Sequence, residues 1–539
     1  MLIKVVLYQQ DKPISHHVLE LQANEFSLPS FSEEYYKSFD LKYVIEFEKN
    51  IDSVIDFSYQ WTSNFKWYTA SRLQPKVLKL INGKYIQSNS TEGYWEVNAK
   101  RRKELIWSLN PKKSCVLAKY TGEVDNKEYE YVNLFNPQKK FSLLVSEKGG
   151  IIWSRSKIPF SGIACFSDHC DFDTRENLEL QRSFFKENDI KMTKGFFLYN
   201  YSKRKENASF EKDSDELMKW IEDGHELAYH SLSQSIKEDK DKVFEEFDNF
   251  TAPLPNIHTW MDHGYLPYNL SSSEKNNRTL NLFFDKMNSQ NVSVVWNYID
   301  TGTTTRGVIN QLNLRHFTLK AFCNGIKELS LKDRMAKGIK NSLFHFYSDR
   351  NYTASYKLFA SVFKPILDKK KVFELKELIV SFFPVFFSLL RIVFRWNTLK
   401  NKVYPLAKYN SVFYSNMING TRFTVFQTLE MVDLVSSLSK ENLNKFCEEK
   451  GVFIAHTYFS VPFKYHKGRM FSTPTEINHQ VRANFEHLGS LIREKKLWNP
   501  TIYELKEYFE NIENLEFFSD ESGEIKVRNN FGYHLNQVQ

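Results

Sequence analysis

The chain has 539 residues, of which 42% are hydrophobic and 16% aromatic, so it can form packed cores and is not a disordered protein. At roughly 100–200 residues per domain, this length predicts two to four domains. The 73 Lys and Arg exceed the 65 Asp and Glu only slightly and are spread along the chain, so the charge does not indicate a nucleic-acid-binding protein.

The first residues and the cysteines indicate the cellular compartment in which the protein is expected. Residues 2–7 form a short apolar run that Lys4 interrupts and that no small-residue cleavage site follows, so we predict a first β-strand there. Five cysteines without a CxxC pair cannot all pair within one chain, which fits a reducing environment. We expect a cytoplasmic protein, with membrane association as an alternative because of an apolar segment described below.

Residues 1–150 combine short alternating runs, such as 129–134 and 140–146, with polar turns. They carry no recognisable chemical motif. We predict an accessory domain of the α+β or β-rich kind, and the turn at Gly149-Gly150 marks its boundary with the next domain.

From residue 151 onward, strands alternate with capped helices. An apolar strand at 163–167 precedes a helix that opens at Thr174, and another strand follows at 195–200. A capping box at Asp213 opens the next helix, which Gly224 closes. Residues 439–449 and 452–457 repeat the pattern. Repeated β-α units predict a parallel, barrel-like sheet, so we expect an α/β domain over 151–515 and a C-terminal tail over 516–539.

Between residues 320 and 414 the alternation of strands and helices stops, and we expect an apolar helical insert. Residues 375–394 are strongly apolar but too short to cross a bilayer comfortably, and Pro384 would kink a helix there. Basic residues flank the segment at Arg391, Arg395 and Lys400. Three interpretations remain open: buried or homo-oligomer-interface helices, a hairpin making peripheral membrane contact through 375–396, and a true span.

Three acids and one imidazole crowd together in Phe166–Thr174, directly after an apolar strand. Strand carboxyl ends are where parallel α/β folds bind ligands. Either Asp173 or Thr174 could cap the helix that follows, but capping would explain only one of the three acids. We therefore predict a metal-binding or catalytic role for at least two of Asp168, His169 and Asp171.

Further histidines lie at the ends of later predicted strands. His230 ends the strand 225–230, whereas His225 points to the opposite face and is predicted to be structural. His258 and His263 flank Asp262, and either imidazole could bind metal; the glycine after His263 favours that residue.

His456 lies near the end of the strand 452–457, where it is either a packed histidine or a catalytic one. Asp300, which follows another β-like segment, could orient it. The aromatic residues near these motifs could stack on sugar rings, although an aromatic core is equally expected. The predicted substrate-binding residues are Trp260, Asp262, Tyr265 and Trp296.

Taken together, the order of these motifs resembles the polysaccharide deacetylase superfamily, carbohydrate esterase family four. The resemblance covers roughly residues 151–320 and 415–515, and the closest stretch is Asp215–Ser231, whose end is similar to the family's second motif. The resemblance implies an irregular (β/α) barrel that uses a divalent metal to remove acetyl groups from N-acetylated sugars.

The resemblance also implies a role for each motif residue. Asp168 matches the general base, His456 the late general acid, and Asp300 the residue that tunes that acid. His230 matches the first metal histidine of the family. His169 stands at the position of the family's metal-binding Asp, a ligand role that Asp171 is expected to take over, and both remain candidate ligands; His263 is the candidate for the further ligand that the site needs. The sequence departs from the family at Gln234, where a second metal histidine is usual. The expected cofactor is zinc, with cobalt, nickel and manganese as alternatives.

We therefore expect a metal-dependent hydrolase that removes an N-acetyl or similar acyl group from an amino sugar in a glycan or activated glycan precursor. The alternative is a catalytically inactive protein of the same fold that binds glycan or acts in polysaccharide assembly. Gln234 is consistent with that alternative.

Overall fold

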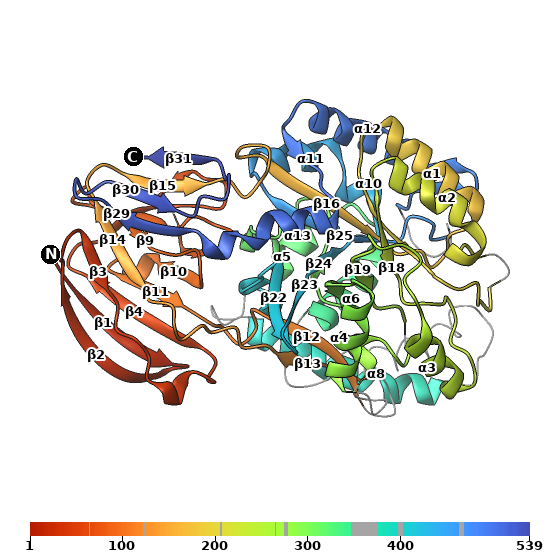
Figure 1. Ribbon diagram of the computed structural model, residues 1–539, viewed down its shortest axis with the longest axis horizontal. Coiled ribbons are helices and arrows are strands. Elements are labelled where there is room, and N and C mark those ends of the chain that lie inside the picture. Colours follow the sequence, from red (N-terminus) through yellow and green to blue (C-terminus); the bar gives the residue numbers. More distant parts are fainter. Residues whose placement is uncertain are drawn as a thin grey trace.

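The computed structural model describes residues 1–63, 65–121, 126–204, 207–264, 266–273, 279–345, 375–396, 403–462 and 468–539. A β-sheet domain formed largely by the first third of the chain lies beside a larger domain, in which helices surround a curled sheet (Figure 1).

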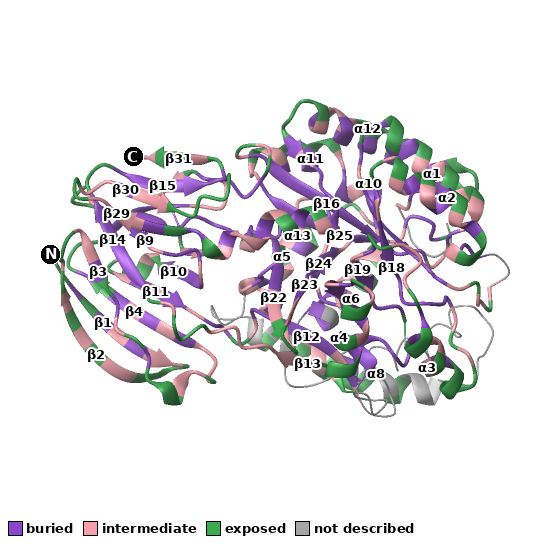
Figure 2. Ribbon diagram, in the orientation of Figure 1, coloured by how far each residue is buried: buried purple, intermediate pink, exposed green. Residues whose placement is uncertain are grey.

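The N-terminal domain consists of two six-stranded antiparallel sheets that share one core. The first sheet has the order β2 (Lys12–Glu20), β1 (Leu2–Gln9), β4 (Leu41–Phe47), β11 (Glu104–Ser108), β10 (Tyr94–Asn98) and β7 (Trp67–Ala70). The second has the order β3 (Glu25–Ser27), β14 (Ser142–Ser146), β9 (Tyr85–Ser88), β8 (Val77–Leu80), β5 (Ile51–Ile55) and β6 (Trp61–Thr62). On β1, alternate residues Ile3, Val5 and Leu7 enter the core (Figure 2).

The C-terminal residues return to this first domain. Strand β31 (Leu535–Val538) pairs with β15 (Gly150–Trp153), and β29 (Glu516–Ser519) pairs with β30 (Ile525–Arg528). The Phe517 N–H donates to the Asn89 carbonyl at 2.9 Å. Two expected boundaries are therefore corrected: residues 516–539 are part of the β-sheet domain rather than a separate tail, and the sheet of the larger domain begins at β16 rather than at residue 151. Within residues 1–150, the hairpin of β12 (Val116–Thr121) and β13 (Asn126–Tyr131) packs on the larger domain, because Asn297 and Tyr414 donate to its backbone carbonyls.

The larger domain is built on a mostly parallel sheet. In spatial order, β16 (Gly162–Asp168), β17 (Thr193–Phe196), β18 (Glu226–Tyr229), β19 (Thr259–Met261), β20 (Val294–Trp296) and β23 (Thr421–Phe426) pair in parallel. Strand β23 continues through Gln427 into β24 (Thr428–Glu430), which pairs with β25 (Val452–Thr457), and β25 pairs with β16. The sheet is extended by β21 (Asp300–Thr303), β22 (Phe413–Ile418) and β28 (Leu497–Trp498). The hydrogen-bonded order is an open path from β21 to β22, and the continuity of β23 with β24 links its two ends into a ring.

Helices α1 (Arg175–Glu187), α2 (Phe210–Glu222), α3 (Lys240–Asn249), α4 (Leu280–Ser289), α10 (Leu434–Ser437), α11 (Lys440–Glu448), α12 (His479–Arg493) and α13 (Ile502–Glu510) surround this sheet. The predicted caps at Thr174 and Ser439 are present, because each hydroxyl accepts an N–H from the first turn. The predicted start at Asp213 coincides with a kink, at which a first helical turn joins the rest of the helix. The second helix begins at Phe210, and Asp213 has non-helical torsions while its carboxylate accepts the Ser209 N–H.

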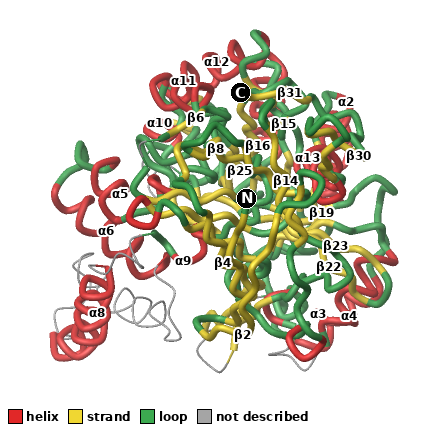
Figure 3. The backbone as a smooth tube through the Cα atoms, turned by 90° about the vertical axis from the view of Figure 1, so that its left-hand side faces the viewer, coloured by secondary structure: helices red, strands yellow, loops and turns green. Residues whose placement is uncertain are grey.

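The apolar insert contains α5 (Leu319–Gly325), α6 (Leu331–His345), α8 (Leu375–Trp396) and α9 (Pro405–Lys408). Helix α8 is continuous through Pro384, packs beside α6, and lies at the edge of the molecule (Figure 3). Lys400 falls outside the described residues. Among the helices that the structure describes, none combines the length and the apolar character that a membrane span requires.

Candidate metal and catalytic site

The carboxyl ends of the parallel strands bring the predicted site residues to one edge of the sheet. His169 and Asp171 follow β16, His230 follows β18, His263 follows β19, Trp296 ends β20, and His456 lies near the end of β25. Residues from five strands therefore meet, although nearly 290 positions separate the first from the last.

Asp171, His230 and His263 form the centre of the cluster. The Asp171 carboxylate lies 3.0 Å from His230 Nε2 and 3.2 Å from His263 Nδ1, and those two nitrogens are 3.1 Å apart. The outer ring nitrogens face backbone carbonyls: His230 Nδ1 is 3.3 Å from the Met261 oxygen, and His263 Nε2 is 2.8 Å from the Gln234 oxygen. When the outer nitrogens donate to these carbonyls, the inner nitrogens present lone pairs.

This arrangement fits a cation. Two imidazole lone pairs and a carboxylate so close together repel one another unless positive charge lies between them. Burial alone would raise the pKa of Asp171, but His263 and His230 hold it well below its usual range. Burial opposes protonation of His263, and Asp171 raises its pKa despite that burial. Imidazole and carboxylate donors are the set that zinc binds.

His169 adds a further donor. The nearest donor atoms of His169, Asp171 and His230 all lie within 4.8 Å of one another. Both His169 ring nitrogens are buried, and neither has a hydrogen-bond partner among the described residues. Burial, with His456 and His230 nearby, lowers the pKa of His169 well below its ordinary value, so the ring is neutral. A buried neutral imidazole with unused lone pairs is suited to metal binding.

His456 and Asp300 form a second unit beside this cluster. His456 Nδ1 lies 3.1 Å from Asp300 Oδ1, which also accepts the Thr428 hydroxyl at 2.7 Å. The His456 ring lies 4.2 Å from the His169 ring and 4.6 Å from Trp296, measured between centroids. His456 Nε2 is buried and has no partner in the described part of the chain, so it remains available for a proton.

Asp168 requires a correction. It is fully buried, and Lys194 Nζ donates to its Oδ2 while the Thr457 hydroxyl and the Phe459 N–H donate to its Oδ1. Burial raises its pKa to about 6, although Lys194 opposes the rise. Lys194 Nζ also lies 2.7 Å from Asp173. A carboxylate held by these donors is a structural ion-pair partner, and the expected role as general base does not fit it.

The predicted substrate residues separate into three groups. Trp260 is fully buried among Tyr229, Phe247 and Phe283, so it is a core residue. Asp262 accepts the Trp260 indole N–H and the backbone N–H groups of Leu270 and Ser271, which makes it a structural cap. These two assignments are corrected because neither side chain faces the histidine cluster. Trp296 packs edge-on against His169 at 4.7 Å and does line the cluster. Tyr265 lies outside the described residues.

His225 and His258 lie away from the cluster. His258 stacks on Tyr503 of α13 with 4.2 Å between ring centroids. His225 Nδ1 accepts the Met192 N–H at 3.1 Å, in line with its predicted structural role. Both contribute to the wall of a cavity of about 180 Å³ beside α13.

Burial lowers the pKa of His225 to about 4. The unfolded chain has the ordinary value of about 6.5, so the protonated ring favours unfolding, and stability falls as the pH drops from about 6.5 to about 4. We expect His225→Gln to remove about 2 kcal/mol of this acid-induced loss. Urea denaturation at neutral and mildly acidic pH measures the loss, and an unchanged difference between the two pH values would contradict the expectation.

Several residues that surround the site were not among the predicted site residues. Tyr298 and Ser231 adopt left-handed backbone torsions, with φ of 65° and 57°, beside the cluster. Such strain is concentrated at functional sites. The Ser231 hydroxyl accepts the His263 N–H at 3.1 Å, and the Tyr458 ring lies 5.1 Å from that of His169. Only the position of Ser231, directly after His230, could have indicated it.

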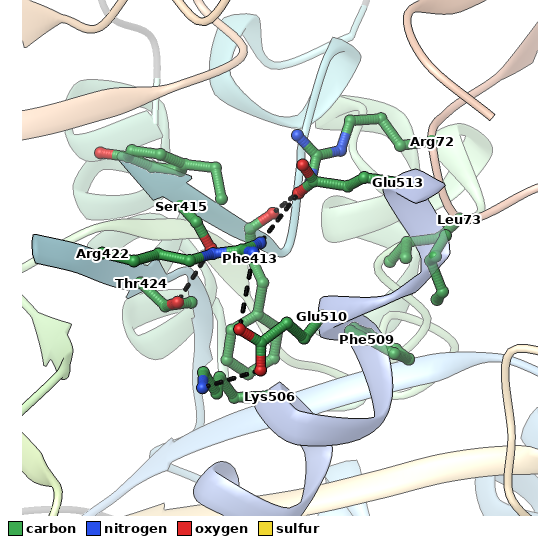
Figure 4. A pocket seen from close by; sticks show the side chains of 12 residues that line it. Arg72, Leu73, Phe413, Ser415, Arg422, Thr424, Lys506, Phe509, Glu510 and Glu513 are labelled. Carbon is green, nitrogen blue, oxygen red and sulfur yellow. Dashed lines mark hydrogen bonds and ion pairs between the residues drawn. The ribbon is translucent and has the colours of Figure 1, made fainter. Parts of the chain in front are cut away.

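A pocket between the two domains is distinct from this site (Figure 4). Its charged walls neutralise each other through the pairs Arg72–Glu513 at 2.7 Å and Lys506–Glu510 at 3.1 Å. Its volume of about 20 Å³ accommodates roughly one water molecule, so we regard it as part of the domain joint.

Comparison with known proteins gives no family. No protein-family model matches the chain, and no curated protein matches it. A GH36 alpha-galactosidase from Geobacillus stearothermophilus is 9% identical, with 52% of this chain and 51% of that chain covered and a TM-score of 0.21. A xylosidase from Aspergillus niger is 9% identical over 55% and 42% of the two chains, with a TM-score of 0.19. A Flavobacterium johnsoniae GH31 dextranase complexed with glucose is 9% identical over 91% and 59%, with a TM-score of 0.27. The chain thus spans about half the length of the first two structures, and likenesses this weak inform neither fold nor function.

Proposed function

We propose that the protein is a metal-dependent hydrolase that removes an N-acetyl or similar acyl group from an amino sugar in a glycan or activated glycan precursor. One observation carries this proposal: the inner nitrogens of His230 and His263 and the Asp171 carboxylate face one point, with distances of 3.0–3.2 Å between them. Donor atoms of this kind and spacing favour a divalent cation, for which zinc is the first candidate.

The residues Asp171, His230 and His263 would hold the cation, with His169 as a further ligand. A bound divalent cation polarises an acyl carbonyl and lowers the pKa of water. Gln234, which replaces the usual second histidine of the motif, contributes its backbone carbonyl and thereby fixes the ring orientation of His263. The departure at Gln234 is therefore compatible with a working site.

His456 would carry the proton. Its Nδ1 faces Asp300, which fixes the ring and leaves Nε2 as the proton acceptor. Nε2 would take a proton from the attacking water as the new C–O bond forms. The same nitrogen would then return that proton to the amine nitrogen as the C–N bond breaks, releasing the free amino sugar and the carboxylic acid, whose own proton passes to the amine or to solvent. One histidine would thus serve as both base and acid, replacing Asp168.

The proposed fold is an irregular (β/α) barrel of the polysaccharide deacetylase kind. The ring of strands from β16 through β25 supports it, as does the gathering of site residues at strand carboxyl ends. The short hairpin of β26 (Phe471–Thr473) and β27 (Glu476–Ile477) lies outside that ring.

Release of acetate from an N-acetylamino sugar tests the function. We expect the zinc-loaded protein to release one acetate for each free amine formed, with nucleotide-linked and lipid-linked N-acetylamino sugars as substrates. A protein that holds the metal and binds these sugars, yet releases no acetate with zinc, cobalt, nickel or manganese, would instead be the inactive glycan-binding alternative.

A further inference from the structure

Helix α8 exposes an unusual amount of apolar surface. Seventeen large hydrophobic side chains are exposed in the described part of the chain, and eight of them lie on this one helix. They are Ile379, Val380, Phe382, Phe383, Phe386, Phe387, Leu390 and Phe394. We call these eight side chains the α8 apolar face. Scattered single exposures are ordinary, but a contiguous set of this size marks an interaction surface.

The packing of α8 leaves this face outward. Val385 is buried, and Leu389, one turn further on, packs against the core of the large domain. The exposed phenylalanines pair among themselves: the rings of Phe382 and Phe386 stack at 5.7 Å, and those of Phe383 and Phe387 at 6.4 Å. The helix thus packs on the body through Val385 and Leu389 and presents a row of aromatic rings on its other side. Figure 3 shows that the helix itself lies at the edge of the molecule.

The excess of basic residues near the α8 apolar face favours an anionic partner. Residues 319–345 and 375–396 together contain nine Lys and Arg but three Asp and Glu, whereas the whole chain has 73 against 65. Exposed Lys332 and exposed Arg391 lie on α6 and α8, and Leu331 and Met335 of α6 are exposed as well. Apolar side chains bordered by basic ones match the acyl and headgroup layers of an anionic membrane.

We infer that α8 binds in the plane of an anionic lipid bilayer, with the α8 apolar face inserted at the boundary between headgroups and acyl chains. Lys337 and Lys340 of α6 pair with Asp433 and Glu430 of the large domain. The exposed basic residues Lys320, Lys332 and Arg391 would contact the lipid phosphates. Helix α6 joins this surface to the site, because His345 Nε2 lies 2.8 Å from the Thr303 hydroxyl on β21, the strand that begins with Asp300. The inference does not depend on the proposed hydrolysis.

Sedimentation with lipid vesicles tests the inference on the full chain. We expect partitioning onto phosphatidylcholine vesicles containing phosphatidylglycerol to exceed that onto pure phosphatidylcholine by about tenfold or more, and to weaken with salt. The double variant Phe383→Ser/Phe387→Ser should lower partitioning onto the anionic vesicles by about tenfold or more. Both side chains are at least half exposed, so the fold should persist, which circular dichroism verifies.

The matched control is Leu282→Ser/Phe531→Ser, which removes side chains of similar exposure, 54% and 50%, elsewhere on the molecule. This control should bind vesicles like the unaltered chain. Equal binding by the α8 variant would overturn the inference. It would also be overturned if vesicles bound nothing while light scattering revealed a dimer that the α8 variant disperses, because the occupant would then be a second copy of the chain.

Discussion

His230→Ala should abolish stoichiometric zinc binding and lower kcat/KM for deacetylation by about 1,000-fold or more. The imidazole is the central donor of the proposed set, because it lies 3.0 Å from Asp171 and 3.1 Å from His263, and its nearest donor atom lies within 4.8 Å of that of His169. Its loss leaves Asp171, His263 and His169 without the four-ligand arrangement of a stable zinc site. A cation that supplies about 4 kcal/mol of transition-state stabilisation accounts for a rate loss of this size. Elemental analysis after dialysis and initial rates of acetate release measure the two effects.

The control for this substitution is His258→Ala. His258 is also a strand-associated histidine, but it stacks on Tyr503 on a different part of the domain. It should retain one zinc per chain and most of its activity. Full zinc occupancy in the His230 variant would contradict the placement of the metal, even if activity were lost.

His456→Ala should lower kcat by about 10²–10⁴-fold while leaving zinc stoichiometry unchanged, because His456 is proposed to move protons and not to hold the metal. Asp300→Asn should lower kcat by about 10–100-fold, since the amide no longer fixes the proton on His456 Nδ1. Steady-state kinetics together with metal content separate these effects from loss of the cation.

The pH dependence of kcat distinguishes a loss of proton transfer from a loss of packing around His456. If His456 transfers the proton, His456→Ala should change the shape of the kcat profile, whereas a variant that loses only packing should keep that shape. Retention of the complete profile in that variant, or loss of zinc with it, would assign the proton transfer to another group.

The sequence allowed a substantial part of the site to be predicted. Polar residues at the ends of apolar strands were expected to converge, and Asp171, His230, His263 and His456 do lie together. This prediction succeeded because the parallel strands of repeated β-α units all end at the same edge of the sheet. Residues that follow such strands therefore lie close together even when they are far apart in the sequence. The pairing of Asp300 with His456 followed from the same logic.

The role of Asp168 could not be predicted in this way. Its environment depends on Lys194, a lysine on β17 that local patterns would assign to an exposed position. Lysine is seldom fully buried, and only the packing of α1 against the sheet reveals that Asp168 and Asp173 surround it. Likewise, Trp260 and Trp296 lie on the neighbouring short strands β19 and β20 but one position apart in register, so the pleat directs Trp260 into the core and Trp296 to the histidines.

Local sequence patterns could not predict the domain boundaries either. The pairing of β15 with β31 joins residues nearly 390 positions apart, and no periodicity in either strand specifies its partner. The C-terminal strands form two separate two-stranded sheets, β15–β31 and β29–β30, and Phe517 and Ile525 pack into a core with residues from distant parts of the chain, such as Leu144.

The most direct test of the central claim is a crystal of the zinc-loaded protein measured on both sides of the zinc absorption edge. We predict one strong anomalous peak per chain, about 2.0–2.2 Å from His230 Nε2, His263 Nδ1 and an Asp171 oxygen. A fully loaded crystal with no peak among these residues, or with its peak elsewhere on the chain, would contradict the account.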